Sequence, residues 1–389
     1  MHNFDTPINR KGTHSIKWDM LEEHYGTSDL TSMWVADSDF KSPQVVIDHL
    51  VKRAEHGIFG YTACTDDFYN AFIEWIKRHH SFELKKEWIT TTPGVVAAMN
   101  FAIQTFTKPG DKIIIQSPVY PPFFNSIKNN GRILVENPLI EKEQSYEMDF
   151  EHFEKAIDDQ TKMLILCNPH NPIGRVWTKE ELIRLGDICT RKDILVLSDE
   201  IHSDLILDSY THTPFASLSE DLMNRTITCY APSKTFNVAG LATSVAVIPN
   251  SDLREQFLQF KRDIGVDTPT VFGIEAFTAC YEEGDDWLKE QMAYIQGNID
   301  YVNTYLSEQL PMIKAFKMEG TYLMWLDCRR LNLSHEDLQR FFIDNVKVAL
   351  NSGTMFGAAG NGFMRVNLAT PRQNVERFMV QLKEAYNTL

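Results

Sequence analysis

The sequence predicts an α/β protein in which a large, mostly parallel, doubly wound sheet domain is joined to a smaller α+β domain. Two observations predict this fold class. Short apolar runs rich in β-branched residues recur in the middle of the chain, with helical patterns between them. After about residue 270 the pattern changes to long amphipathic stretches with few strand candidates.

The large domain is predicted from apolar runs that are each followed by turn residues. Nearly continuous apolar strands are what a parallel sheet needs when helices cover both of its faces. Between the strands, residues 179–191 carry apolar side chains on one face of a helix, which supports an alternation of strand and helix. The predicted strands are residues 112–116, 163–166, 194–197, 226–230 and 244–248.

The smaller domain is predicted from the last third of the chain. A long amphipathic stretch at 274–310 comes first, and Ser334 stands where a helix N-cap is expected. The further elements are a strand at 321–327, a helix at 335–344, a strand at 363–368 and a closing helix at 375–386.

The length of 389 residues corresponds to two or three domains of ordinary size. We predict that residues 46–275 form the large domain. Residues 1–45 and 276–389 are predicted to form the small domain from both ends of the chain. No internal repeat and no long linker interrupt the sequence, so the two domains are expected to pack closely.

Charge and cysteine usage exclude several classes of partner. The chain has 38 Lys and Arg residues against 53 Asp and Glu residues, a net charge of −15. Such a protein binds polyanions poorly, so neither nucleic acid nor a membrane is expected as a partner. No Cys/His cluster has zinc spacing, so no metal site is expected. Scattered cysteines and an opening segment without an apolar stretch favour a cytoplasmic location.

Polar residues of different chemistry follow several of the predicted strands. In an open parallel sheet, ligands bind beyond the carboxyl ends of the strands. Several strand ends that each carry a different functional group therefore predict a site at this edge. The residues are Tyr120, Asn171, Asp199, His202 and Lys234.

Two of these residues suggest a particular chemistry. A lysine partly removed from water at a strand end has a lowered pKa and can form a Schiff base with an aldehyde, so Lys234 is a candidate. A surface lysine in a loop is the alternative. Asp199 can hold a pyridine nitrogen protonated, which turns the ring into an electron sink. A helix N-cap is the alternative for Asp199.

Three further segments are candidates for binding anions or aiming side chains. Gly94 precedes a helical run, whose free backbone amides could bind phosphate, although a helix start without a ligand is the alternative. The Asn-Pro units at 168–172 predict a rigid turn that aims Asn171 at a ligand, or a plain turn. Arg365, midway along an apolar strand, could grip a carboxylate with two hydrogen bonds, or lie partly exposed on the sheet.

Together these segments resemble the pyridoxal-phosphate enzymes of the aspartate-aminotransferase fold, called fold type I. The resemblance covers nearly the whole chain, and the motifs come in the order that the family shows. They are Gly60-Tyr61, Gly94, Tyr120, Asn171, Asp199, Lys234 and Arg365.

Within that superfamily the sequence resembles the MalY/PatB-type cysteine-S-conjugate β-lyases, also called cystathionine β-lyases. The matching strings are MWVADSDF at 33–40, HGIFGY at 56–61, SPVYPPF at 117–123, DEIH at 199–202 and SKTFNVAGL at 233–241. Typical aminotransferases have a tyrosine where this chain has His202, and a phosphate-binding arginine where it has Ala242. Ala231 replaces a phosphate-binding Ser or Thr, so other groups are expected to bind more of the phosphate.

The resemblance implies roles around the cofactor ring. Lys234 holds pyridoxal phosphate and, once released, removes the Cα proton of the amino acid. Asp199 keeps the pyridine nitrogen protonated. Tyr120 stacks on the ring, and Asn171 and His202 hydrogen-bond its phenolate oxygen.

It also implies the groups that bind phosphate and substrate. The amides of Val95 and Val96 and the hydroxyl of Ser233 bind the phosphate. Tyr61 reaches the phosphate from a neighbouring subunit and joins Lys234 in the catalytic set. A homodimer with shared active sites is therefore expected.

The carboxylate of the amino-acid substrate is bound by Arg365 and the backbone near Ala36, and Tyr120 also contacts the substrate. The implied activity is α,β-elimination of cystathionine or another cysteine S-conjugate to pyruvate, ammonia and a thiol. An aminotransferase is the closest alternative, because it uses the same fold and cofactor. A regulatory or binding protein that keeps the fold is a further alternative.

Overall fold

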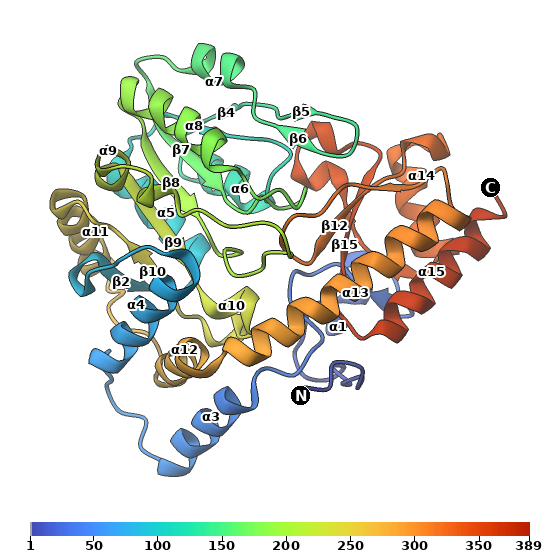
Figure 1. Ribbon diagram of the computed structural model, residues 1–389, viewed down its shortest axis with the longest axis horizontal. Helices are drawn as coiled ribbons and strands as arrows, with labels where there is room; N and C mark the ends of the chain where they lie inside the picture. Colours follow the sequence, from blue (N-terminus) through green and yellow to red (C-terminus); the bar gives the residue numbers. More distant parts are fainter. Residues whose placement is uncertain (1) are drawn as a thin grey trace.

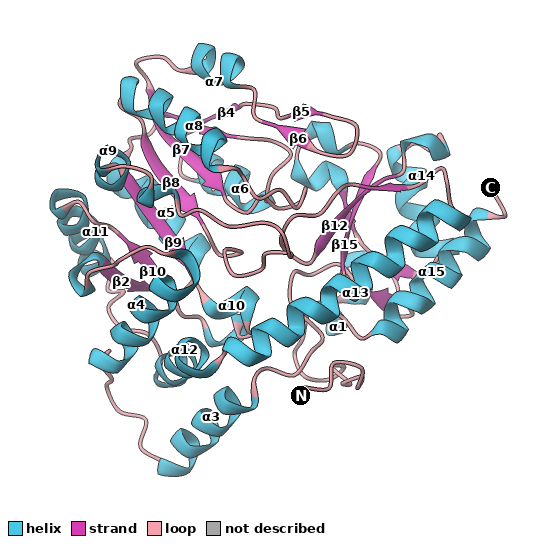
Figure 2. Ribbon diagram, viewed as in Figure 1, coloured by secondary structure: helices cyan, strands magenta, loops and turns pink. Residues whose placement is uncertain are grey.

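The computed structural model describes residues 2–389, and a seven-stranded sheet forms its centre (Figure 1, Figure 2). Neighbouring strands are parallel except at β10, which is antiparallel to both of its neighbours. The strand order is β2 (Ile89–Thr92), β10 (Ser244–Val247), β9 (Thr226–Tyr230), β8 (Leu195–Asp199), β7 (Thr161–Cys167), β3 (Lys112–Ile115) and β4 (Ile133–Glu136). The predicted doubly wound fold class is confirmed.

Helices cover both faces of this sheet because its strands are apolar on both sides. Ile113 and Ile115 pack on one face, and Ile114, between them, packs on the other. On the first face lie α5 (Val95–Phe106), α6 (Pro121–Asn129) and α11 (Ser251–Asp263). On the second lie α7 (Phe150–Ala156), α8 (Lys179–Arg191) and α9 (Glu220–Asn224).

Helix α8 has the bounds that the sequence predicts. Thr178 accepts a hydrogen bond from the Glu181 amide, and Glu181 caps the Thr178 amide in return. The apolar face of the helix, with Leu182, Leu185 and Ile188, is buried against the sheet. Reciprocal capping and an apolar stripe together make this helix predictable from local sequence.

A third group of helices lies beside the β2 end of the sheet. It comprises α3 (Gln44–His56), α4 (Asp66–His80) and α12 (Val271–Glu283). The predicted stretch at 274–310 is two helices, α12 and α13 (Asp285–Gln309), which meet at Gly284. A Cβ on Gly284 would lie 2.3 Å from both the Cys280 carbonyl oxygen and a ring carbon of Phe236. The break between the helices therefore requires glycine.

The long helix α13 runs from α12 towards the C-terminal strands β12 and β15 (Figure 1). One continuous apolar core extends from α4 and α12 along α13 into the C-terminal region, so the two regions are packed together. The predicted boundary at 275 and 276 falls inside α12, which packs against α3 and α4. The division into domains stays a prediction.

The smaller region contains a four-stranded antiparallel sheet in the order β11 (Lys314–Ala315), β12 (Leu323–Asp327), β15 (Phe363–Asn367) and β14 (Asn351–Ser352). Helices α14 (His335–Arg340) and α15 (Arg372–Tyr386) belong to it, and the Ser334 hydroxyl caps α14 as predicted. Residues 341–345 continue α14 as a π-helix.

The amino-terminal segment joins this smaller region. It contains α1 (Ile16–Asp19), α2 (Leu21–Tyr25) and β1 (Thr31–Ser32), which pairs in parallel with β13 (Val348–Ala349). A two-stranded hairpin, β5 (Ile140–Glu141) and β6 (Tyr146–Glu147), lies outside the main sheet. Within residues 2–389 there is no helix of the length and apolarity that crossing a membrane requires.

We expect Gly360→Ala to destabilise the fold by about 1–3 kcal/mol, because an added Cβ overpacks a backbone contact. That Cβ would lie 1.9 Å from the carbonyl oxygen of Gly353. The loop between these glycines carries Phe356, whose ring lies 4.9 Å from the guanidinium carbon of Arg365. Chemical denaturation measures the loss. Gly240→Ala is the control, because its Cβ would meet nothing within 4 Å; equal losses would contradict the packing argument.

Candidate functional site

The predicted site residues gather around one cavity of about 300 Å³ beyond the carboxyl ends of β7, β8 and β9. This is the edge at which an open parallel sheet binds ligands. The predicted residues that line the cavity are Ala36, Val95, Val96, Tyr120, Asn171, Asp199, His202, Ser233 and Lys234. Arg365 is joined to this set through a hydrogen bond to Asn171. Tyr61 does not line the cavity.

Lys234 lies in the short helix α10 (Pro232–Thr235), which begins one residue after β9 ends. Its Nζ donates a hydrogen bond of 2.6 Å to the carbonyl oxygen of Ala36. Burial lowers the pKa of this amine to about 8, and the charge of Arg365 acts in the same direction. Lys234 is therefore a desolvated amine inside the site rather than a surface lysine.

Asp199 is the last residue of β8 and is 5% exposed. Within residues 2–389 its carboxylate accepts one hydrogen bond, of 3.2 Å, from the amide of Ile201. Burial raises the pKa of this carboxyl to about 7. No helix begins after Asp199, so the N-cap alternative does not apply, and an under-bonded carboxylate faces the cavity.

Two neighbouring groups are suited to donate to an oxygen of a ligand. His202 is 3% exposed, and burial lowers the pKa of its ring to about 3, so the ring is neutral near neutral pH. Its Nδ1 is buried without a hydrogen-bond partner in residues 2–389. Asn171 uses its Oδ1 to accept from Arg365, and its side-chain nitrogen has no partner among the described residues.

The predicted phosphate site is the amino-terminal end of helix α5. Gly94 precedes the helix with φ 157° and ψ 157°, and Val95 and Val96 supply its first amides beside the cavity. Such amides have no acceptor within a helix and favour an anion. Among the described residues that line the cavity, Lys234 is the only cationic side chain. The helix end therefore supplies the remaining positive potential for a phosphate.

Arg365 is 4% exposed on β15 and has no carboxylate partner in residues 2–389. Its guanidinium donates to Asn171 Oδ1 at 2.9 Å and to the carbonyl oxygen of Trp34 at 2.8 Å. It also donates to Asn351 Oδ1 at 2.6 Å. Burial lowers the pKa of the guanidinium to about 10. A buried cation held only by neutral acceptors favours an anionic ligand.

Sequence reasoning missed two residues of this arrangement. Asn351 lies opposite Arg365 in the pairing of β14 with β15 and holds its guanidinium. Tyr322 donates from its hydroxyl to the same Ala36 carbonyl that Lys234 contacts, at 3.0 Å. Tyr322 and Ala36 are 286 residues apart, and Asn351 meets Arg365 only through strand register, so no local pattern could have indicated either residue.

Tyr61 is fully exposed in the single chain, on the segment between α3 and α4. Ile58 and Phe59 in the same segment are 66% and 57% exposed. Three neighbouring apolar or aromatic side chains in solvent are unusual for a surface that contacts nothing. The predicted role of Tyr61 in the site of another subunit stays a prediction.

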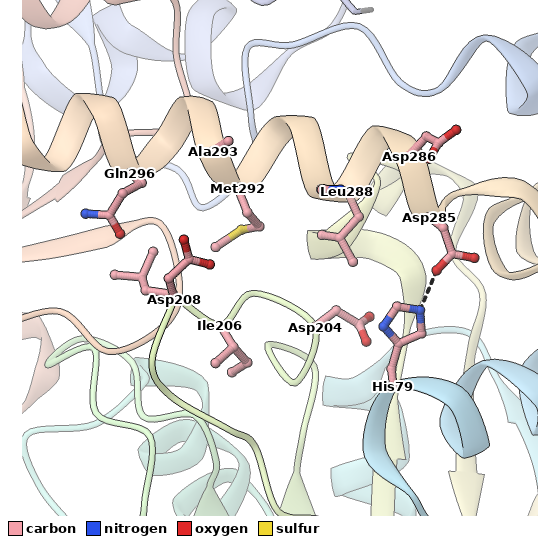
Figure 3. A pocket seen from close by; sticks show the side chains of 12 residues that line it. His79, Asp204, Ile206, Asp208, Asp285, Asp286, Leu288, Met292, Ala293 and Gln296 are labelled. Carbon is pink, nitrogen blue, oxygen red and sulfur yellow. Dashed lines mark hydrogen bonds and ion pairs between the residues drawn. The ribbon is translucent and has the colours of Figure 1, made fainter.

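A second cavity, of about 460 Å³, lies along α13, and Figure 3 shows the carboxylates that surround it. His79 and Asp285 form a hydrogen bond of 2.6 Å at its edge. Asp204 on its wall accepts from the hydroxyl of Thr235 at 2.8 Å, and Thr235 follows Lys234 in the chain. A hydrogen bond from the residue after Lys234 therefore reaches the wall of this second cavity.

The aminotransferase class I and II family model matches residues 30–382. The chain belongs to the aminotransferase class I and II family. Cystathionine β-lyase PatB of Bacillus subtilis is 43% identical over 385 residues, which cover 98% of this chain and 100% of PatB.

Two solved structures are also similar to this family member. Cystalysin of Treponema denticola, which contains a pyridoxal 5'-phosphate cofactor, has a TM-score of 0.97 and 40% identity and covers 100% of this chain. That match covers 99% of the cystalysin chain. A pyridoxal-phosphate-bound C-S lyase of Staphylococcus hominis has a TM-score of 0.93 and 32% identity, and the match covers 99% of this chain and 98% of that one.

Pyridoxal phosphate is the cofactor of this family, and the cavity fits it. The under-bonded carboxylate of Asp199 would face the pyridine nitrogen, and the amides at the start of α5 would hold the phosphate. The amine of Lys234 lines the same cavity and would be the group that reacts with an aldehyde. The neutral ring of His202 and the amide of Asn171 supply donors for the phenolate oxygen.

We expect Asp199→Asn to stabilise the cofactor-free protein at pH 8 by on the order of 3 kcal/mol, and to have little effect near pH 4. The folded pKa of Asp199 is about 7, above the unfolded value of about 3.9. Between these values the folded protein holds a proton that the unfolded chain releases, so stability falls as pH rises. Thermal unfolding at both pH values measures the difference.

The control for this experiment is Asp187→Asn, which changes an exposed carboxylate on α8. It should leave the melting temperature nearly unchanged at both pH values. An equal gain in stability for Asp199→Asn at pH 4 and pH 8 would show that folding does not raise the pKa of the Asp199 carboxyl.

Proposed function

We propose that this protein is a pyridoxal-phosphate-dependent C–S β-lyase that acts on cystathionine or other cysteine S-conjugates. The observation that carries the proposal is one cavity lined by Lys234 and Asp199, with the buried guanidinium of Arg365 bonded to Asn171 in its wall. The relatives support it, because cystathionine β-lyases and C-S lyases match along nearly the whole chain.

The bound cofactor supplies an electron sink that stabilises negative charge at the substrate Cα. Asp199 contributes a buried carboxylate at the pyridine nitrogen, where its charge favours a proton. Tyr120 supplies an aromatic face beside the cavity.

Tyr120 itself directly precedes α6, where its backbone forms the N-cap.

The substrate is oriented by groups of the chain itself. The guanidinium of Arg365 already holds three neutral acceptors in place, and a substrate carboxylate would give it the missing negative partner. The backbone at Ala36 lies at the same end of the cavity, because its carbonyl accepts from Lys234. An amino acid held there would present its Cα to the lysine amine.

Lys234 is the group that moves the proton. With its pKa lowered to about 8, a larger fraction of the amine is neutral near pH 7 than in an exposed lysine, so Nζ can accept the Cα proton. The bond between the β-carbon and sulfur then breaks, and sulfur leaves as a thiolate. The remaining aminoacrylate takes up water and gives pyruvate and ammonia, which completes the atom balance.

An aminotransferase remains the second candidate because the family includes aminotransferases, whose reaction starts with the same proton transfer. Elimination and transamination differ in the reactants that they require. Elimination requires a leaving group on the β-carbon and no second substrate. Transamination requires a keto-acid acceptor and leaves the carbon–sulfur bond intact.

We expect the purified, cofactor-loaded protein to release pyruvate and a free thiol from cystathionine in equal amounts without a keto acid. Lys234→Ala should lose this activity by at least about a thousandfold, because both the proton acceptor and the attachment point are removed. It should also lose the visible absorbance of the bound cofactor. Colorimetric pyruvate and thiol assays with a panel of cysteine conjugates measure the reaction.

Product formation that depends on an added keto acid would instead identify an aminotransferase. Retention of the visible absorbance in Lys234→Ala would remove the assignment of this lysine. Lys261→Ala is a matched control for the loss of a mostly buried amine outside the cavity, since Lys261 bonds to Thr90 and Thr91.

We also propose that the active form is a homodimer in which Tyr61 completes the partner's site. The support is the exposure of Tyr61, Ile58 and Phe59 on one segment, together with a cavity that has few cationic groups for a phosphate. A cytoplasmic location is a further proposal, supported by six cysteines that form no disulfide within residues 2–389.

We expect Tyr61→Ala and Lys234→Ala each to be inactive alone and to regain activity when the two are refolded together. In a mixed dimer one site carries both substitutions and the other carries neither. Random pairing makes about half of the dimers mixed, so about a quarter of the wild-type activity should return. No recovery, with mixed dimers confirmed by differential tagging, would show that each chain completes its own site.

A further inference from the structure

Two thiols flank the carboxylate of Asp199. Strands β7, β8 and β9 are parallel, and the pairing of their last residues places Asp199 between Cys167 and Cys229. Side chains at the same level of neighbouring strands point to the same face of a sheet. Both thiols are buried, at 3% and 1% exposure, and both belong to the apolar core on the α5 face of the sheet.

Neither thiol donates a hydrogen bond to the carboxylate. The S–H of Cys167 points to the carbonyl oxygen of Pro169 at 3.4 Å, and its sulfur accepts from the amide of Asn171 at 3.4 Å. The thiol of Cys229 makes no hydrogen bond within residues 2–389. The only donor to the carboxylate of Asp199 in that range is the amide of Ile201.

The charged groups around Asp199 do not replace these missing donors. Lys234 acts on it through its charge without a hydrogen bond between them, and the adjacent carboxylate of Glu200 opposes ionisation. Glu200 is bonded to its own buried donors, among them His212 and Tyr230. Tyr120 also lies within electrostatic range of Asp199. Its hydroxyl is neutral, because burial and the charge of Asp199 raise the pKa of Tyr120.

The absence of donors has a defined consequence for a proton shared with a pyridine nitrogen. Hydrogen bonds to a carboxylate stabilise its charged form. They therefore favour the state in which the proton is on nitrogen, and they let the pair lose its proton at lower pH. A carboxylate between two thiols that do not donate therefore favours the proton on nitrogen less strongly. Its pair with the pyridine nitrogen also keeps the proton to a higher pH.

We propose that Cys167 and Cys229 are positioning residues for the proton that Asp199 shares with the pyridine nitrogen of pyridoxal phosphate. By excluding side-chain donors on both sides of the carboxylate, they keep this proton in the pair and weaken its bias towards nitrogen. The two thiols thereby moderate the electron sink without touching the substrate. The inference depends on the cofactor but not on which amino acid is eliminated.

Cys229→Ser is the most direct test, because the sulfur has no other partner and a hydroxyl at this position can donate to Asp199. Cys229→Ala removes the thiol without adding a donor. Cys189→Ser is the matched control, since Cys189 is buried to the same degree but lies on α8, on the other face of the sheet.

The measurement is the nitrogen-15 chemical shift of the bound cofactor, labelled at its pyridine nitrogen, over a range of pH. We expect Cys229→Ser to move the signal towards that of protonated pyridine and to lower its titration midpoint by about one pH unit. Cys229→Ala and Cys189→Ser should keep the wild-type midpoint. Cys167→Ser should give a smaller change in the same direction, because its hydroxyl can also donate to Pro169.

Equal shifts in Cys229→Ser and Cys229→Ala, or a wild-type titration in Cys229→Ser, would overturn the proposal. Thermal unfolding and cofactor content are recorded for every variant. A labelled signal in the wild type that resembles free cofactor would instead count against cofactor binding itself, so the two failures are distinguishable.

Discussion

The site depends on a buried guanidinium that has no carboxylate partner within residues 2–389. Arg365 donates to the backbone of Trp34, to Asn171 and to Asn351, which belong to the amino-terminal segment, the large sheet domain and the C-terminal sheet. Removing a cation from water without a charged partner costs several kcal/mol. The remaining structure must offset that cost, so these three segments are held together where a substrate carboxylate would bind.

Burial of ionisable groups also determines the properties of Asp199 and Lys234, which line the cavity. Burial raises the pKa of Asp199 and lowers that of Lys234, so both groups lie near the neutral range instead of far from it. Groups with such pKa values exchange protons readily at physiological pH. Desolvated charges at one edge of the sheet thus lower the stability of the fold. The apolar layers on the two faces of the sheet offset this loss.

Several parts of this arrangement were predictable from local sequence. Helix α8 and strand β9 have the predicted bounds, because capping and apolar patterning act over a few residues. Because the carboxyl ends of parallel strands lie at one edge of a sheet, the sequence alone placed Asp199, Lys234 and Asn171 at a common site. The resemblance to fold type I enzymes then added the cofactor.

What the sequence by itself determined was the alternation of central strands and helices, with α8 and β9 at their observed bounds, and the chemistry at the strand ends. Tertiary structure alone decided the antiparallel direction of β10, the break at Gly284, and the approach of Asn351 to Arg365 and of Tyr322 to Ala36. It also placed Cys167 and Cys229 on either side of Asp199. The physical reason is that secondary structure follows short-range patterns, whereas strand register and buried pairing join residues that are far apart in the chain.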